Sequence, residues 1–354
     1  MKILYLSFTN TRYSSNATHI DGLRKCGVEV VTYFPPAQNW RKYLQIARFY
    51  RQNRQGASFV IVGNDCPKLV VFLKMISRRP LVYNALCSVY ERLIVSRNLA
   101  GRRSFKAFYY WLLDFFASHF SNLVMLESGH QIEYFSRLFL LKKTKCFLAW
   151  TGTDEESFFF DPQVEKTRDF TVIFRGRLLP EAGAEVAVEA AKILEPAGVK
   201  VLMCASGIGL PRIQSLIKKL QPPNLELVTD FLPIEQIREV VQSAHLSLGQ
   251  LSAHPRLSRT VPHKAYESLA LKTAYLTARN EGVLELLKEN ETCLAFSPGD
   301  ARDLADKILW EKGHPRELMR IADNAYELYM SHLTEKHLAN RLLERLRSID
   351  PGFV

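Results

Sequence analysis

The sequence predicts an α/β protein of two domains, each built around a doubly wound parallel sheet. The chain has 354 residues, which is longer than one ordinary single-core domain. Short apolar runs alternate with helix-length segments along the chain, as in parallel sheets that helices cover on both faces. This alternation stops over residues 151–168, a polar, acidic stretch with a proline, and then restarts. We therefore expect a linker there between two domains.

The first half contains six runs of strand length, separated by helical patterns. The expected strands are 3–8, 28–33, 59–62, 81–83, 123–126 and 146–149, and the expected helices include 17–25, 40–54, 104–120 and 129–139. The helix over 104–120 is dense in aromatic residues. A helix lying on a membrane surface would carry Lys or Arg along one face, and this one offers only Lys106, so a buried core helix is expected.

The second half repeats the pattern and ends in helices. The expected strands are 170–174, 199–204, 225–228, 246–248, 274–277 and 293–296, and the expected helices include 181–194, 211–220, 234–243 and the helical pattern 315–346. We expect an N-terminal domain over 1–160, a second domain over 161–325, and helices over 326–354 that pack back across the domain junction. Because such sheets bind ligands at the carboxyl ends of their strands, two facing domains predict a cleft.

Charge is distributed unequally between the halves. Residues 1–150 hold 22 Lys and Arg against 7 Asp and Glu, a net +15, and the rest holds 25 against 29. A strongly basic half predicts an anionic partner, which is a membrane surface, a phosphorylated acceptor or nucleic acid. A solvated basic surface that aids solubility is the alternative. The basic residues are dispersed over many elements and form no known nucleic-acid-binding motif, so no nucleic-acid partner is expected.

Composition favours a globular cytoplasmic protein. The chain is 47% hydrophobic and 23% charged, and the run after Lys2 is too short for a signal-peptide core. No stretch reaches the roughly 20 apolar residues that span a bilayer. The six cysteines are scattered without a C-x-x-C pair, as in proteins of a reducing compartment. The histidines and cysteines show no metal-ligand spacing, and the chain has neither a G-x-G-x-x-G dinucleotide fingerprint nor a Walker A sequence. Neither a metal nor another cofactor is therefore expected.

The segment RTVPHKAYESLALKT, residues 259–273, has features of an anion-binding helix start. Pro262 suits a first turn, and Lys264 follows it beside the free backbone N–H groups and the positive end of the helix dipole. Glu267 lies three residues further on the same face and can accept hydrogen bonds from ribose hydroxyls. An ordinary surface ion pair between Lys264 and Glu267 is the alternative.

The segment FRGRLLPEAGAEVAVEAAKIL, residues 174–194, reads as a strand, a tight turn at Gly176 and a helix that begins near Glu181. Arg175 and Arg177 then project at the carboxyl end of the first strand of the second sheet, where arginine can grip phosphate through two hydrogen bonds. The alternative pairs Arg177 with Glu181 or Glu185 on the surface.

Taken in order, these segments resemble the GT-B glycosyltransferases, and among them the retaining group 1 type (family 4). TVPHKAYESLALKTAYLTA is similar to that family's P-x-K-x-x-E helix and following strand, and ARNEGVLELL to its loop and helix after the sugar-binding strand. PLVYNALCSVYERLIVSR is similar to members with a serine, a tyrosine and an acid after a strand of the acceptor domain. The resemblance covers nearly the whole chain and implies transfer from a nucleotide sugar, most commonly a UDP-sugar, with retention.

The resemblance also implies roles for individual residues. Lys264 and Arg177, at the turn of Gly176, would hold the donor diphosphate, Glu267 would bind the ribose, and the backbone at Glu281 and Gly282 would approach the sugar. No metal would be needed, because the two cations and the helix start neutralise the leaving diphosphate. Ser88, Glu91 and His19 are the catalytic candidates of the first domain. Near His19, Asn16 either faces the cleft or caps a helix.

Two positions depart from the family pattern. The lysine expected five residues after Arg177 is Ala182, and the first acid of the family's E-x7-E motif is Arg259. Arg256 or Arg259 could supply the charge that is missing at Ala182. The glycine-rich first loop of the relatives is replaced by TNTRYSSNATH, residues 9–19.

Two functions therefore remain from the sequence. The first is a glycosyltransferase that acts on a polysaccharide or lipid-linked acceptor bound by the basic domain, with contact to an anionic membrane at its cytoplasmic face. The second is a catalytically silent protein that binds a nucleotide sugar.

Overall fold

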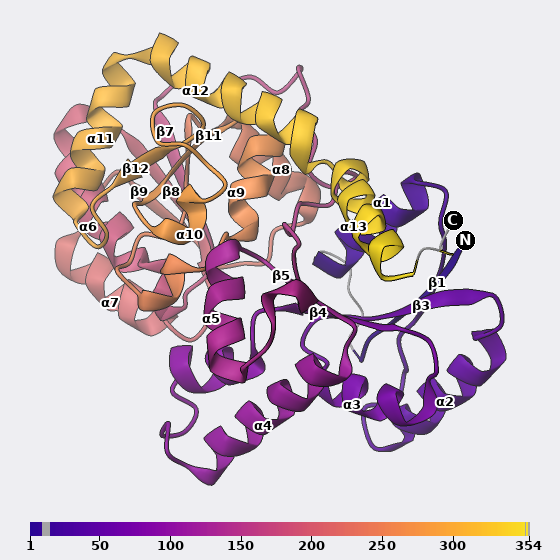
Figure 1. Ribbon diagram of the computed structural model, residues 1–354. Coiled ribbons are helices and arrows are strands. Elements are labelled where there is room, and N and C mark those ends of the chain that lie inside the picture. The colour runs from indigo at the N-terminus through magenta and orange to yellow at the C-terminus, as the bar shows by residue number, and fades with distance from the viewer. Residues whose placement is uncertain (9–14, 351, 353–354) are drawn as a thin grey trace. The chain divides into compact units, whose positions relative to one another are not determined.

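The computed structural model describes residues 1–8, 15–350 and 352, and the chain divides into two compact units (Figure 1). Unit 1 comprises Met1–Asp154 with Leu333–Val354, and unit 2 comprises Glu155–His332. The expected boundary lay after residue 160, with a separate segment over 326–354. In the structure, the final helix belongs to unit 1. Residues 9–14 of the segment TNTRYSSNATH lie outside the described residues.

Unit 1 contains a six-stranded parallel sheet of order β2-β1-β3-β4-β5-β6. Its strands are β1 (Lys2–Leu6), β2 (Glu29–Tyr33), β3 (Ala57–Val62), β4 (Leu81–Leu86), β5 (Leu123–Leu126) and β6 (Cys146–Leu148). Its helices are α1 (Ser15–Lys25), α2 (Arg41–Asn53), α3 (Pro67–Ile76), α4 (Phe105–Phe120), α5 (Gly129–Phe139) and α13 (Glu335–Ile349), with a π-helix over Glu91–Ser96. The order is that of a doubly wound sheet, as expected from the sequence.

Both faces of this sheet are buried, because alternate side chains of each strand point to opposite sides. Leu4 and Leu6 of β1 join the core cluster that includes residues of α2, α3 and α5. Ile3 and Tyr5 join the opposite cluster, which includes residues of α1 and α13. The near-continuous apolar runs in the sequence reflect this burial on two sides.

Helices α1 and α13 pack closely because Gly22 lies between them. A Cβ atom at Gly22 would overlap the carbonyl oxygen of Glu335 and approach the Cβ of Ala339 at 3.1 Å. Lys25 adds an ion pair to the buried Glu335 at 2.7 Å. A glycine is therefore required here for close approach, which a sequence without homologues does not reveal.

We predict that Gly22→Ala lowers the stability of the protein by about 2 kcal/mol, because the clash is with backbone of α13 and cannot be relieved by one rotamer. Thermal unfolding measures the change. Gly313→Ala is the matched control, since that position lies at the end of a helix with open space around it. Equal midpoints for the two variants would contradict the packing described.

Unit 2 contains a second six-stranded parallel sheet, of order β12-β11-β10-β7-β8-β9. Its strands are β7 (Thr171–Arg177), β8 (Lys200–Ser206), β9 (Leu225–Val228), β10 (Leu246–Leu248), β11 (Ala274–Ala278) and β12 (Leu294–Phe296). Its helices are α6 (Ala184–Leu194), α7 (Leu210–Leu220), α8 (Ile234–Ser243), α9 (His263–Ala270), α10 (Glu281–Leu284), α11 (Ala301–Gly313) and α12 (Pro315–Leu328).

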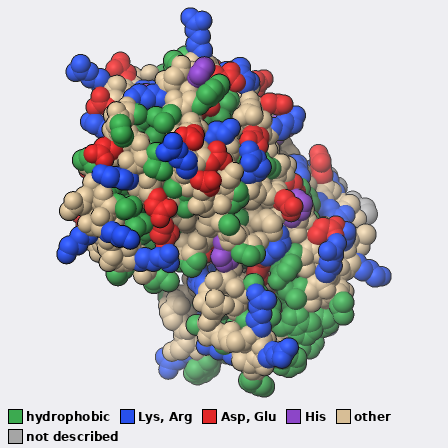
Figure 2. Space-filling model, turned by 90° about the vertical axis from the view of Figure 1, so that its left-hand side faces the viewer, with side chains coloured by type: hydrophobic (Ala, Val, Ile, Leu, Met, Phe, Trp, Pro, Cys, Tyr) green, Lys and Arg blue, Asp and Glu red, His purple; other side chains and the backbone are tan. Residues whose placement is uncertain are grey.

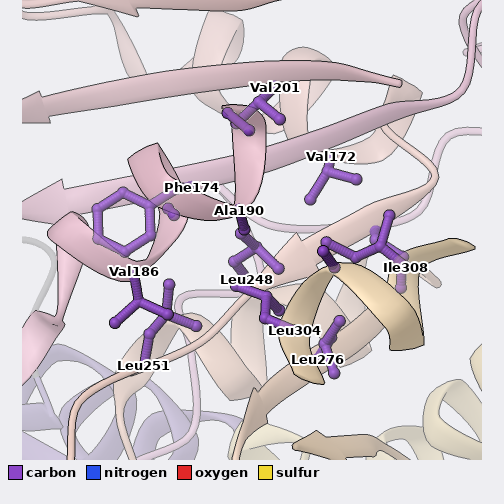
Figure 3. Close-up of a cluster of buried hydrophobic side chains, with 14 of the residues drawn as sticks. Val172, Phe174, Val186, Ala190, Val201, Leu248, Leu251, Leu276, Leu304 and Ile308 are labelled. Atoms are coloured by element: carbon purple, nitrogen blue, oxygen red, sulfur yellow. The ribbon is translucent and has the colours of Figure 1, made fainter. Parts of the chain in front are cut away.

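The core of unit 2 lies between this sheet and its helices. Figure 3 shows Phe174 of β7 and Leu248 of β10 among side chains from α6 and α11, such as Val186 and Leu304. Helices α9 and α12 contact each other and β11. This packing holds the β7 and β10 strands rigidly, so the residues at their carboxyl ends have fixed positions.

The helix expected over 181–194 begins three residues later, at Ala184. Residues Pro180–Ala182 form a 3-10 turn, and Gly183 then adopts a left-handed conformation with φ of 66°. A Cβ at Gly183 would also meet the backbone nitrogen of Ser252 at 2.5 Å. The proline and the glycine thus separate the turn from the helix.

The expectation that α4 is a buried core helix is wrong. Only four of its residues are buried, namely Ala107, Asp114, Ala117 and Ser118. Phe105 is 86% exposed and Phe108 is 55% exposed. An apolar pattern alone cannot distinguish a buried helix from one that exposes its aromatic side chains.

Candidate functional site

The candidate site lies where the order of the unit 2 sheet reverses. The chain runs from β7 outward through β8 to β9, and then continues on the other side of β7 with β10. The carboxyl ends of β7 and β10 are therefore adjacent at a topological switch point, where doubly wound sheets bind their ligands. Arg175, Gly176 and Arg177 end β7, and Gly249 follows β10.

Lys264 extends from the first turn of α9 toward these strand ends. Its Nζ donates a hydrogen bond to the carbonyl oxygen of Gly249 at 3.1 Å and lies 4.7 Å from the ring centre of Phe174. The predicted Pro262 is the N-cap residue of α9, so Lys264 does lie beside the unpaired N–H groups of the helix start. An anion at this place would meet both the amine and the helix dipole.

The pKa of Lys264 is lowered to about 7, and burial is the largest cause. The nearby guanidinium of Arg175 also lowers this pKa, and the carboxylate of Glu267 raises it by a smaller amount. Near neutral pH the amine is therefore only partly protonated in the free protein. An anionic ligand would favour the protonated form. Binding of a phosphate near neutral pH would therefore increase the protonated fraction of Lys264.

Glu267 pairs with Arg175 across the site. The Nη2 of Arg175 donates to the Oε2 of Glu267, and the two side chains are 11% and 14% exposed. The alternative surface pair of Glu267 with Lys264 is not formed. The second carboxylate oxygen, Oε1, has no hydrogen bond to any residue that the structure describes, and it can accept hydrogen bonds from a ligand.

The Arg175–Glu267 pair leads to a prediction about stability. Arg175→Met leaves a poorly solvated carboxylate without its partner, and we expect a loss of about 2 kcal/mol. The double variant Arg175→Met, Glu267→Leu removes both charges and should be more stable than the single variant. Chemical denaturation of the wild type, of Arg175→Met, of Glu267→Leu and of the double variant checks this. A double variant that loses the sum of both single effects would contradict a direct interaction.

The structure places the other donor-side candidates in two groups. A Cβ at Gly176 would lie 4.0 Å from the Nζ of Lys264, and Gly176 has φ of 123°, so it belongs to the Lys264 group. Arg177 is exposed at the end of β7. Its alternative partners are engaged elsewhere, Glu181 with Arg256 and Glu185 with Arg212. Arg177 therefore faces solvent at the strand ends, where a ligand can reach it.

Arg256, Arg259 and Gly282 form the second group. The Nη1 of Arg256 lies 3.3 Å from the Oε1 of Glu181, in the turn that also contains Ala182. The guanidinium thus lies beside the turn in which the family pattern has a lysine. The Nη1 of Arg259 donates to the Oγ of Ser258 at 3.2 Å.

Gly282 supports this second group through its backbone. A Cβ at Gly282 would lie 2.6 Å from the carbonyl oxygen of Leu257 and 2.6 Å from the nitrogen of Thr260. The glycine therefore lets α10 pack against the segment that carries Arg256 and Arg259. Glu281, the first residue of α10, is exposed.

Two of the three candidates of unit 1, Ser88 and Glu91, lie after β4 in a buried polar region. The Oγ of Ser88 accepts a hydrogen bond from the backbone nitrogen of Glu91 at 2.8 Å, and the Oε2 of Glu91 accepts one from Gln131 at 2.8 Å. Both Ser88 and Glu91 are fully buried. Helix α4 contacts the same segment, because Asp114 of α4 accepts a hydrogen bond from the backbone nitrogen of Tyr90 at 2.8 Å. Burial raises the pKa of Asp114 to about 8.

His19 and Asn16 lie on α1, and both are buried. The Oδ1 of Asn16 accepts hydrogen bonds from the hydroxyl of Tyr5 at 2.6 Å, from Asn84 at 3.0 Å and from the nitrogen of Asn64 at 3.0 Å. Asn16 is the second residue of α1. It joins the carboxyl ends of β1, β3 and β4.

Sequence reasoning placed Arg175 at the strand end as a group that could grip phosphate, but it did not predict the pairing of Arg175 with Glu267. It also missed the hydrogen-bond network of Asn16. The charge of Arg175 next to Gly176 was the available signal. Pairings such as Asn16 with Asn84 join residues far apart in the chain, and one sequence gives no signal for them.

In residues 1–8, 15–350 and 352, no three or more His, Cys, Asp or Glu side chains are grouped so as to hold a metal ion. None of the helices described is both long and apolar enough to cross a bilayer.

Solved structures share the fold of this chain. HepE of Anabaena, solved in complex with UDP and glucose, superposes with a TM-score of 0.74 at 16% identity, covering 98% of this chain and 100% of HepE. Sucrose-phosphate synthase of Thermosynechococcus elongatus gives 0.74 at 13%, covering 99% of each chain. A glycosyltransferase from Rickettsia africae gives 0.70 at 13%, again covering 99% of each chain. The chain therefore has the GT-B fold.

A family comparison gives the narrower assignment. Residues 155–328, nearly all of unit 2, match the family described as glycosyl transferases group 1. No curated protein matches the sequence. Over these residues, just under half of the chain, the protein is similar to the group 1 glycosyl transferases.

Proposed function

We propose that this protein transfers a sugar from a nucleotide-sugar donor to an acceptor. One observation carries the proposal: Arg175, Lys264 and Glu267 meet at the switch point of a group 1 glycosyl transferase unit. Lys264 at a helix start, together with Arg177 at the adjacent strand end, suits a diphosphate. The carboxylate of Glu267, which Arg175 holds and which has one unused oxygen, suits ribose hydroxyls.

The proposed donor is a UDP-sugar. HepE was solved with UDP-glucose, and it superposes with a TM-score of 0.75 at 15% identity. Lys264 and Arg177 would bind the diphosphate, Glu267 the ribose, and the segment at Glu281 and Gly282 the sugar. The cations and the α9 start would neutralise the leaving diphosphate, so the proposed reaction uses no metal. We propose retention at the anomeric carbon, as the resemblance to the retaining family implies.

The proposed acceptor is a growing polysaccharide or a lipid-linked glycan, bound by unit 1. The net charge of +15 over residues 1–150 favours an acceptor that carries phosphate. The same charge favours contact with an anionic membrane, which would present a lipid-linked acceptor to the enzyme. Ser88, Glu91 and His19 remain the proposed catalytic residues of unit 1.

A catalytically silent nucleotide-sugar binding protein is the second candidate. Ala182 favours it, because this buried residue supplies no charge at the turn where the family pattern has a lysine. In this case a donor would bind, but neither transfer nor hydrolysis would follow.

The test has two stages. Thermal unfolding with UDP-, GDP- and ADP-sugars identifies the donor, since a ligand at about 100 times its Kd adds about 2.7 kcal/mol of stability. Release of the nucleotide is then followed with phosphorylated and lipid-linked glycans, with and without a metal chelator. Stabilisation by a UDP-sugar and acceptor-dependent release support the enzyme. Stabilisation with no release under any condition supports the silent protein, and no stabilisation by any nucleotide sugar contradicts both.

A further inference from the structure

Helix α4 and the loop before it expose an unusual number of aromatic side chains. Phe105, Phe108, Tyr109 and Phe116 are all exposed, at 86%, 55%, 40% and 39%. Their spacings of three, four and eleven residues from Phe105 put them on one face of the helix, opposite its buried side. Four large exposed aromatic side chains on one face are far more than scattered surface hydrophobics would produce.

Basic residues surround this aromatic face. The exposed residues Arg97, Arg102, Arg103 and Lys106 lie in or just before the first turn of α4, and residues 97–113 contain no Asp or Glu. Leu99 adds an exposed apolar side chain to the loop, and Lys68 of α3 lies 5.4 Å from the ring centre of Tyr109. Figure 2 shows hydrophobic side chains gathered in the lower part of the view, with Lys and Arg side chains beside them.

We propose that α4 and the loop 97–104 form a docking surface for an anionic phospholipid bilayer, with the aromatic face inserted among the headgroups. The combination matches what such a surface requires, namely aromatic side chains on one side and basic residues that contact acidic headgroups. The proposal deepens the proposed membrane contact by naming its surface. It does not depend on sugar transfer.

A second copy of this chain fits the surface less well. A symmetric dimer would place the same patch against itself and bring the four basic residues of each copy together, with no acid in the segment to pair them. A bilayer that contains acidic lipids has the opposite charge and offers apolar volume to the aromatic side chains. Charge complementarity therefore favours a bilayer with acidic lipids over a second copy of this chain.

The docking surface is connected to the candidate site of unit 1. Asp114 on the buried side of α4 accepts the hydrogen bond from Tyr90, in the loop that contains Ser88 and Glu91. A bilayer bound to the outer face of α4 would thus lie on the same helix that anchors this loop. That arrangement would bring the headgroup of a membrane-bound acceptor near unit 1.

The test is flotation of the purified protein with vesicles of phosphatidylcholine alone, or with about a third phosphatidylglycerol. The wild type should float with the acidic vesicles only, and less at high salt. Phe105→Ser with Phe108→Ser should reduce binding at least about tenfold, and Arg102→Glu with Arg103→Glu more strongly, because each lost charge accounts for about fivefold. All replaced side chains are exposed, so the fold should be retained.

Matched controls are available in unit 2. Phe231→Ser removes a phenylalanine that is 96% exposed, and Lys218→Glu with Lys219→Glu reverses two exposed charges on α7. Both should bind vesicles as the wild type does. UDP affinity, measured in parallel, should not change in any variant, which separates this proposal from the proposed function.

Three outcomes would overturn the proposal. One is equal binding of the α4 variants and the wild type to acidic vesicles. Another is no binding of the wild type to acidic vesicles. The third is a wild-type dimer in sedimentation that becomes monomeric on Phe105→Ser with Phe108→Ser and never floats, which would assign the face to contact between copies.

Discussion

Lys264→Met should weaken binding of a UDP-sugar by about 100-fold and leave the thermal midpoint unchanged or higher. The affinity falls because the variant loses a charged hydrogen-bond donor to the diphosphate at the start of α9. Stability does not fall, because Met fills a similar volume without a buried amine. Calorimetric titration and thermal unfolding measure the two effects. Lys218→Met, on the exposed face of α7, is the control and should change neither.

The same residue predicts how donor affinity depends on pH. Lys264 has a pKa of about 7 in the free protein, and a bound diphosphate would raise it. Below about pH 7 the amine is already protonated, and affinity should not depend on its titration. Above that pH, binding must take up a proton, and affinity should fall by up to tenfold per pH unit. UDP-glucose is the suitable ligand, because its doubly esterified diphosphate does not titrate near neutral pH.

Lys264→Met should abolish this pH dependence. Relative to the wild type, the variant should also show its largest gain in stability below about pH 7, because there the folded wild type contains a buried charged amine. Between the pKa of Lys264 in the folded protein and its unfolded value of about 10.4, the unfolded wild type binds more protons than the folded one. The wild type therefore gains stability as the pH rises through this range, and the difference in stability between variant and wild type becomes smaller. A parallel pH dependence of donor affinity in wild type and variant would show that another group titrates.

Glu267→Ala should weaken UDP binding by about 30-fold, through loss of charged hydrogen bonds to the ribose. The Oε1 of Glu267 is the acceptor for these bonds, since Oε2 already accepts from Arg175. The decisive comparison uses a UDP analogue without the two ribose hydroxyls. Removing the hydroxyls should weaken binding to the wild type by a similar factor and have little further effect in the variant.

Equal losses from hydroxyl removal in both proteins would contradict the ribose role of Glu267. Glu285→Ala is the control, because this carboxylate lies near the end of the short helix α10, outside the Lys264 group. Arg175→Met should have a smaller effect on affinity than Glu267→Ala if Arg175 acts by holding the carboxylate in place. A larger effect would indicate that Arg175 itself binds the ligand.

Much of the fold could be predicted because burial on two faces leaves a strong pattern. Each strand of a parallel sheet reads as a continuous apolar run, and the runs near Ile3 and Phe174 correspond to β1 and β7. The position of Lys264 after Pro262 was also predictable, because helix starts have local signals. These features depend on residues that are close together in the chain.

Features that depend on distant residues could not be predicted. Arg175 and Glu267 are 92 positions apart, and nothing local indicates that they pair. The need for a glycine at Gly22 arises from α13, at the other end of the chain. The exposure of α4 was missed for a different reason, since aromatic side chains produce the same apolar pattern whether a neighbour covers them or not.

If unit 2 binds the diphosphate of a nucleotide donor through Lys264, removing the amine should reduce the affinity for the diphosphate and not for the nucleoside. The most direct measurement is the affinity of UDP and of uridine for the wild type and for Lys264→Met, which together form a thermodynamic cycle. We expect UDP to bind the wild type far more tightly than uridine does, and most of this difference to be lost in the variant. An equal preference for UDP over uridine in both proteins would contradict this role of Lys264.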